Sequence, residues 1–123
     1  MKISKLSLDL VVNNVENTAR FYSNILGFEV LEIDENFARL KAGDSEIMLM
    51  SKSDFDQEVP ALNRPKNEGW TVLIVEVMDI KDVYESIRSK VEIIRELQRT
   101  NYGTQEFLLK DPDGYLIQFT QRD

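Results

Sequence analysis

The chain contains no cysteine and no histidine among its 123 residues. Without cysteine, disulfides, thiol catalysis and thiolate metal sites are excluded. Without histidine, a Ser-His-Asp triad, imidazole acid–base chemistry and every histidine-containing metal site are excluded as well. Any metal site would therefore consist of oxygen ligands from Asp and Glu.

Positive charge is scarce: 15 Lys and Arg stand against 22 Asp and Glu, a net charge of −7. The basic residues are scattered among acids, whereas nucleic-acid binding depends on clustered positive charge. We therefore expect no nucleic-acid partner. An acidic surface favours cationic small molecules or basic partners, or it serves solubility alone.

A long apolar run is missing too. The first residues, MKISKLSLDLVVNN, carry a short apolar stretch that Asp9 interrupts and Asn13 ends. Such a stretch makes a poor signal-peptide core and cannot span a membrane. We expect a cytoplasmic protein with no membrane partner, folded as a single domain over 1–123.

The chain repeats one pattern, which begins with a strand at 6–12. Asn14 is placed to cap a helix that Gly27 ends. The apolar face of that helix recurs at helical spacing: Val15, Ala19, Tyr22 and Leu26. Three further strands are expected at 28–34, 37–42 and 46–51. The polar segment 52–69, with two prolines, is the predicted linker.

The second copy of the pattern begins with an expected strand at 70–77, and Asp79 is expected to cap the next helix. The apolar face of this helix comprises Ile80, Val83, Tyr84 and Ile87. The expected strands that follow are 91–98, 102–110 and 115–121, the last two joined by a D-P-D-G turn. The sequence thus predicts an α+β fold of two βαβββ modules, at about 4–51 and 70–121.

Side chains alternate across each strand, so one face of several strands is aliphatic and the other is mixed. The aliphatic face is expected to pack under a helix, because an ionised carboxylate in a sealed core is very costly. Two curved mixed sheets that present their mixed faces would form a cup, lined by Ser7, Asp9, Met48, Val72, Ile74, Glu76 and Gln118.

The repeat, the start N-x-V-E-N-T-A-R-F-Y-S-N-I-L-G-F and the terminal E-F-L-L-K-D-P-D-G-Y-L-I-Q-F resemble the glyoxalase / bleomycin-resistance / dioxygenase (vicinal oxygen chelate) superfamily. The likeness runs over essentially the whole chain. These segments are structural signatures, so they indicate the scaffold better than the chemistry.

The resemblance implies four metal-ligand positions, which this chain fills with Ser7, Met48, Val72 and Gln118. Valine has no donor, methionine offers a soft thioether, and serine and glutamine are weak neutral donors. We therefore expect no metal, no cofactor and no lyase or dioxygenase chemistry of the known kind. The alternative is an enzyme with a non-standard, oxygen-only metal site that uses Asp9 and Glu76.

The resemblance is closest to the metal-free bleomycin-resistance branch, whose members are acidic homodimers that sequester a cationic glycopeptide antibiotic. It implies that Phe37 and Tyr102 stack on a planar ligand, and Asp9 and Glu76 would attract its positive charge. Trp70 is either a ligand-facing ring or a packing residue. The other expected lining residues are Ser7, Met48 and Gln118.

Simpler interpretations stay open. Phe37 can be a core strand residue and Tyr102 a turn residue, and each carboxylate can pair with a local Lys or Arg. Glu106 has no assigned role, since no acid–base partner is evident in the sequence. A structural or regulatory protein that uses the scaffold without a ligand is a third hypothesis.

Overall fold

The computed structural model describes residues 1–58 and 71–123. The chain divides into two compact units, Met1–Arg64 and Pro65–Asp123. Each unit holds a four-stranded mixed sheet and its own helices, so the expected α+β class with two repeated modules is confirmed.

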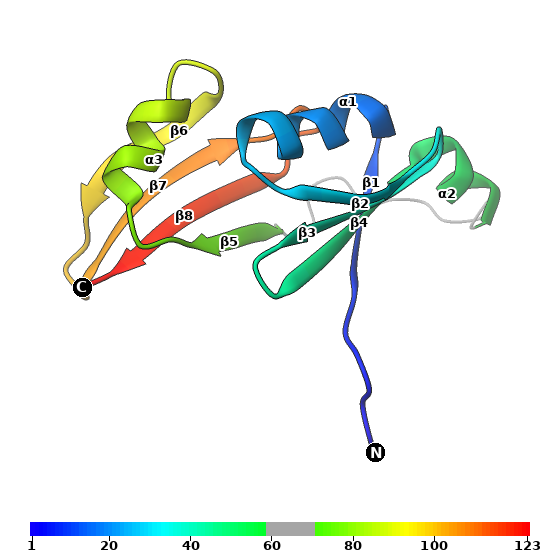
Figure 1. Cartoon of the computed structure of the whole chain (residues 1–123), viewed down its shortest axis with the longest axis horizontal. Helices are drawn as coiled ribbons and strands as arrows, with labels where there is room; N and C mark the ends of the chain where they lie inside the picture. The colour runs from blue at the N-terminus through cyan, green and yellow to red at the C-terminus, as the bar shows by residue number, and fades with distance from the viewer. Residues whose placement is uncertain (59–70) are drawn as a thin grey trace. The chain divides into compact units, whose positions relative to one another are not determined.

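The first unit has its strands in the order β1-β4-β3-β2, with β1 parallel to β4 and the other neighbours antiparallel (Figure 1). Its elements are β1 (Leu8–Val12), α1 (Val15–Arg20), the π-helical segment η1 (Phe21–Ile25), β2 (Glu29–Ile33), β3 (Phe37–Ala42), β4 (Ser45–Ser51) and α2 (Lys52–Glu58).

The core of the first unit lies between α1 and one face of the sheet. The predicted helix face is confirmed for Val15, Ala19 and Tyr22, which are fully buried, whereas Leu26 is only half-buried. The sheet side of the core consists of Leu10, Val12, Ala38, Leu40 and Leu49. As expected, Asn14 caps α1, because its Oδ1 accepts the Asn17 N–H at 2.8 Å.

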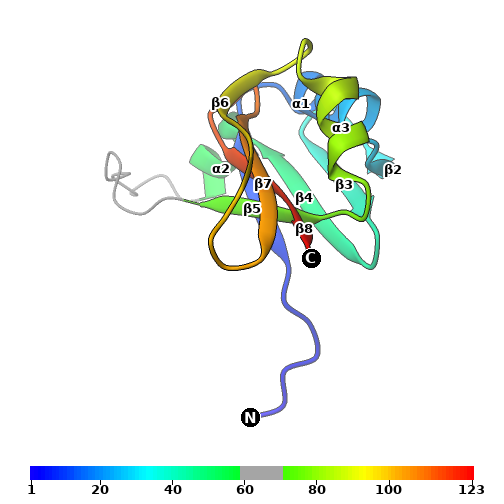
Figure 2. The same ribbon diagram turned by 90° about the vertical axis from the view of Figure 1, so that its left-hand side faces the viewer.

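Two local expectations for the first unit are wrong. The strand predicted over 6–12 begins at Leu8, so Ser7 lies outside β1; residues 1–7 run away from the sheet as an extended segment (Figures 1 and 2). The predicted linker begins with a helix, α2. The Ser51 hydroxyl accepts the Asp54 N–H at 3.1 Å, and Lys52 pairs with Asp56 at 3.1 Å. The rest of the linker, 59–69, lies outside the described residues.

The second unit repeats the topology in the order β5-β8-β7-β6, with β5 parallel to β8. Figure 2 shows the same ribbon turned by 90°. Its elements are β5 (Val72–Glu76), α3 (Ile80–Ile87), β6 (Glu92–Arg99), β7 (Thr104–Lys110) and β8 (Leu116–Arg122).

An aromatic cluster fills the core of the second unit. Phe107 and Phe119 stack with ring centroids 5.0 Å apart, and Tyr84 of α3 meets Phe107 edge-on at 4.9 Å. These contacts place α3 over the face of β7 and β8 that carries the two phenylalanines. The mixed face of this sheet therefore lies opposite α3.

The start of α3 corrects another expectation. Asp79 occupies the N-cap position but makes no side-chain cap hydrogen bond. Instead, Gln121 Oε1 accepts the Ile80 N–H at 2.8 Å. The cap therefore comes from the end of β8, far away in the sequence. No helix among the described residues is long and apolar enough to cross a membrane.

Candidate functional site

The face of the first sheet opposite α1 is a candidate ligand surface, here called the first open face. Strand register places eight side chains of β1, β3 and β4 on it: Asp9, Val11, Phe37, Arg39, Lys41, Glu46, Met48 and Met50. Six of them form two cross-strand rows, Val11–Met50–Phe37 and Asp9–Met48–Arg39. Phe37 and Met48 are half-buried and Asp9 is exposed, so this face carries the mixed character that the alternation predicted.

Asp9 is one acidic group of the first open face, which also carries Glu46. Partial burial, and secondly the negative charge of Glu58, raise the pKa of Asp9 above its usual value. Both effects disfavour the ionised form, and a cation placed beside Asp9 would relieve them. In the same row, Arg39 is already paired, with Glu46 at 2.9 Å and Glu32 at 3.4 Å. The first open face can therefore attract a cation at Asp9.

The face of the second sheet opposite α3 is called the second open face. It comprises Val72, Ile74, Glu76, Glu106, Leu108, Gln118 and Thr120. Ile74 lies opposite Gln118, and Glu76 lies opposite Thr120. Ile74 is 63 % exposed and Val72 is 42 % exposed, so aliphatic surface is available on this face.

Glu106 organises one end of the second open face. It is 4 % exposed, yet its carboxylate is fully engaged. Oε1 accepts the Tyr102 hydroxyl at 3.1 Å and lies 3.5 Å from Arg95 Nη2, while Oε2 accepts the Thr104 hydroxyl at 3.0 Å. Tyr102 itself remains 69 % exposed. Glu106 therefore holds an exposed aromatic ring by its hydroxyl end.

Glu76 differs from Asp9 because it already has a partner. Arg122 Nε donates to Glu76 Oε1 at 2.6 Å, and both side chains are exposed. An exposed ion pair of this kind contributes little to stability. A cationic ligand would have to compete with Arg122 for the Glu76 carboxylate.

The four positions that the family resemblance predicts as metal ligands do not form a donor set within either unit. Ser7 precedes β1, and the cross-strand neighbour of Met48 is Asp9. Val72 has no donor atom, and the Gln118 amide donates to Thr120 Oγ1 at 3.1 Å. In residues 1–58 and 71–123, no three or more Asp or Glu side chains gather where they could hold a metal.

The structure assigns the remaining candidates to separate units. Phe37 belongs to the first unit and Tyr102 to the second. Trp70 lies outside the described residues. Stacking of a planar ligand on Phe37 or Tyr102 stays a prediction.

Sequence reasoning missed the residues that hold Tyr102 in place. Thr104 and Glu106 are two apart on β7, so they share a face, and Arg95 reaches the same carboxylate from β6. Thr100 Oγ1 accepts the Thr104 N–H at 3.1 Å and closes the turn that carries Tyr102 and Gly103, whose φ is +89°. The T-x-x-G-T spacing marks such a turn, but only the β6–β7 register, with its shifts, brings Arg95 to Glu106.

Comparison with known proteins identifies the scaffold. A sequence profile of the Glyoxalase/Bleomycin resistance protein/Dioxygenase superfamily matches residues 5–119. Virulence protein STM3117 of Salmonella typhimurium is 28 % identical over 119 residues, which cover 93 % of this chain and 81 % of that protein.

Solved structures share the fold. A protein of unknown function from Agrobacterium tumefaciens superposes with a TM-score of 0.83 at 21 % identity, over 100 % of this chain and 97 % of its own. A glyoxalase/bleomycin resistance protein/dioxygenase from Nocardioides superposes with a TM-score of 0.77 at 21 % identity, and the match covers 99 % of this chain and 87 % of that one. At these identities the likeness concerns the fold alone.

Proposed function

The chain belongs to the Glyoxalase/Bleomycin resistance protein/Dioxygenase superfamily, whose members bind small molecules, and from this membership we propose that it sequesters a planar, cationic small molecule without a metal. In this proposal the protein acts as a homodimer and carries out no reaction on the ligand.

The observation that carries the proposal is the anchored ring of Tyr102. An exposed tyrosine side chain normally samples several rotamers, and binding then costs conformational entropy. Here the hydroxyl is bound to the buried Glu106 carboxylate, while Tyr102 as a residue stays 69 % exposed. A planar ligand would meet a ring that is already oriented. Stacking and cation–π attraction would each contribute on the order of 0.5–1.5 kcal/mol.

The first open face supports a positive charge on the ligand. Asp9 is an exposed carboxylate whose pKa is raised by partial burial and by Glu58, so a neighbouring cation would stabilise its ionised form. The surrounding side chains Met48, Met50 and Phe37 are apolar and half-buried. A flat cation with apolar edges fits this combination better than an anion or a sugar.

The donor chemistry favours binding over catalysis. Ser7, Met48, Val72 and Gln118 provide no carboxylate or imidazole to a divalent ion. Glu76, a carboxylate of the alternative oxygen-only site, is held by Arg122 at 2.6 Å.

A thermal-shift panel tests the proposal. The probes are metal-free bleomycin and the planar cation proflavine, with Mg²⁺, Mn²⁺ and Zn²⁺ in parallel wells. A true ligand at a hundred times its dissociation constant stabilises the fold by about 2.7 kcal/mol. We expect a shift with a planar cation and none with the metals.

Variants locate the binding. Tyr102→Ala and Phe37→Ala should reduce the shift, and Tyr102→Phe, which keeps the ring but loses the anchor, should reduce it less. Met78→Ala is the matched control, because Met78 is a large apolar side chain that is 93 % exposed outside both open faces. Stoichiometric binding of a divalent metal that Asp9→Asn abolishes would instead support the enzyme alternative and overturn the proposal.

A further inference from the structure

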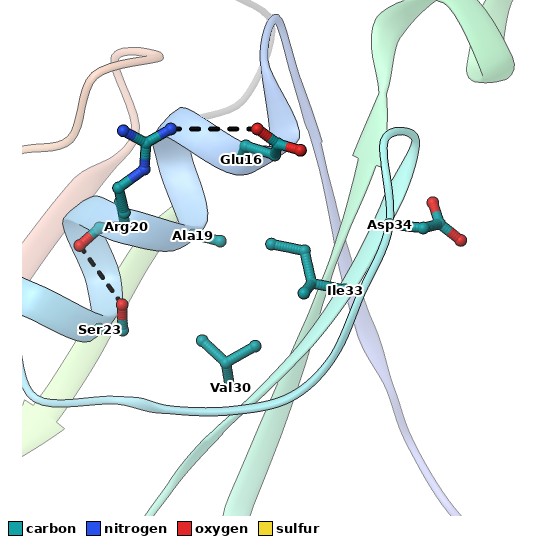
Figure 3. A pocket seen from close by; sticks show the side chains of 7 residues that line it. All are labelled: Glu16, Ala19, Arg20, Ser23, Val30, Ile33 and Asp34. Atoms are coloured by element: carbon teal, nitrogen blue, oxygen red, sulfur yellow. Dashed lines mark hydrogen bonds and ion pairs between the residues drawn. The ribbon is translucent and has the colours of Figure 1, made fainter.

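A groove lies between α1–η1 and β2, on the face of the first sheet opposite the first open face (Figure 3). Its volume is about 270 Å³. It is lined by Glu16, Ala19, Arg20 and Ser23 from the helical side and by Val30, Ile33 and Asp34 from the strand side. This groove, here called the β2 groove, shares no residue with the surfaces of the proposed function.

A shift in the strand register creates the apolar floor of the β2 groove. Val30 pairs with Leu40 and Ile33 with Ala38, but the register slips between Val30 and Glu32. Residues three apart on a regular strand point to opposite faces. The extra residue in β2 brings Val30 and Ile33 to the same face as the buried Leu40 and Ala38.

This floor is open to solvent. Val30 is 38 % exposed and Ile33 is 46 % exposed, although both lie beside fully buried neighbours. In Figure 3 their side chains point from β2 toward the helix, where Ala19 faces them. Because alanine is small, it does not fill the space above Val30 and Ile33. An added aliphatic side chain would bury the exposed parts of both residues.

The strand beside the groove has a free edge. β2 is the last strand of the sheet order β1-β4-β3-β2, and only β3 pairs with it among the described strands. The outward N–H and C=O groups of such a strand can accept a further extended chain. A groove between an edge strand and a helix is the geometry of strand addition, in which the backbone provides affinity and a side-chain pocket provides specificity.

The excess of negative charge around β2 favours a basic partner. The carboxylates near the strand and groove are Glu16, Glu29, Glu32, Asp34 and Glu35, and they outnumber the neighbouring cations Arg20, Arg39 and Lys41. Arg20 forms an ion pair with Glu16 at 4.0 Å. Arg39 forms ion pairs with both Glu32 and Glu46. A basic chain would therefore be attracted, and an acidic chain repelled.

The same charges disfavour a second copy of β2 as the occupant. In an antiparallel pair of β2 strands the glutamates would face like charges, which destabilises cross-strand pairing. We propose that the β2 groove binds an extended basic peptide segment of another protein, which adds a strand to β2 and places one aliphatic side chain against Ala19, Val30 and Ile33. The register shift limits this pairing to a short segment.

Fluorescence anisotropy with labelled peptides tests the proposal on the whole chain. The probe is a short, end-blocked peptide of alternating lysine and valine. Its counterparts are the same peptide with glutamate for lysine, and a version with methylated backbone nitrogens that cannot donate to β2. We expect the basic peptide to bind about tenfold or more tightly than either counterpart, with an affinity that falls as salt rises.

A double substitution on β2 and a control substitution outside the groove test whether the peptide contacts β2. Val30→Ser combined with Ile33→Ser should weaken binding of the basic peptide about tenfold, while Leu6→Ser, which alters an exposed aliphatic side chain outside the groove, should leave it unchanged. Circular dichroism verifies that the variants fold. The proposal is overturned if the methylated or the acidic peptide binds as tightly as the basic peptide, or if the basic peptide does not bind. Both outcomes are measured on the unsubstituted protein. Self-association that the Val30/Ile33 substitutions abolish would overturn it too, since the occupant would then be a second copy.

Discussion

Glu106 and Tyr102 form a pair in which a buried carboxylate holds an exposed ring. The carboxylate has three protein partners, so its burial does not leave an unsatisfied charge. The ring, in contrast, makes no stacking contact with another ring among the described residues. A buried carboxylate thus orients an exposed aromatic side chain through its hydroxyl.

Removal of the Glu106 carboxylate should therefore affect both stability and binding. Glu106→Ala is expected to lower the free energy of unfolding by about 1.5–3 kcal/mol, the range for hydrogen bonds to charged groups. It should also weaken the binding of a planar cation, because the Tyr102 hydroxyl loses its hydrogen-bond acceptor. Chemical denaturation and ligand titration measure the two effects. Glu96→Ala, on exposed β6, should change stability by less than about 0.5 kcal/mol; equal effects of the two variants would contradict the assignment.

Asp9 gives a pH-dependent prediction. Its folded-state pKa is raised by partial burial and by Glu58, so the ionised form costs stability above that pKa and the cost disappears as pH falls through it. Asp9→Asn should therefore raise the melting temperature at pH 7, and the gain should vanish in acid. A melting temperature that is unchanged or lower at pH 7 would contradict this account.

Glu46 provides a control, because its pKa is shifted in the opposite direction from that of Asp9. A hydrogen bond from Arg39 lowers the pKa of Glu46, so its contribution is present above its unfolded-state pKa and is lost as pH falls through the folded-state value. Glu46→Gln should therefore lower the melting temperature at pH 7, and the loss should shrink in acid. Thermal melts of both variants over a pH series provide the comparison.

At the scale of elements, the start of α3 depends on a strand that is distant in sequence. Gln121 Oε1 accepts the Ile80 N–H, whereas Asp79 makes no cap bond. Gln121→Ala should therefore cost about 1 kcal/mol, as the loss of a cap does. Asp79→Ala should cost less, since it removes only a favourable charge near the helix N-terminus. Denaturant titration of both variants checks the order, and the reverse order would contradict it.

The helices and strands that alternate regularly could be predicted from the sequence, and those set by long-range contacts could not. Asn14 and the apolar spacing of Val15, Ala19 and Tyr22 determine α1 locally. The helix α2 was missed because it buries no residue and therefore has no apolar periodicity. Its start does carry a local signal, S-x-x-D at Ser51 and Asp54, which is typical of a helix N-terminus.

The candidate sites show the same division. Strand alternation correctly separated the open faces from the helix-covered faces, because the side-chain period of two is a local property. It could not reveal the β2 groove, since a regular period places Val30 and Ile33 on opposite faces and only the register shift unites them. Nor could it show that Arg122 neutralises Glu76 while Asp9 keeps its raised pKa.

At the scale of the whole molecule, two units with the same topology each present an open face: the first carries Asp9, whose pKa is raised, and the second carries the Glu106 carboxylate that anchors Tyr102. The proposed homodimer would bring such faces from two copies to each ligand. Light scattering of the purified protein should give the mass of a dimer, twice 14.3 kDa. A monomer at all concentrations would contradict this part of the proposal.

The most direct test of the central claim is calorimetric titration of chelator-treated protein with a planar cation from the thermal-shift panel. The account predicts saturable binding that is unchanged when a divalent metal is added back and is weakened by Tyr102→Ala. Binding that requires the metal, or that Tyr102→Ala leaves untouched, would contradict the claim that this protein binds a flat cation through an anchored aromatic ring and without a metal.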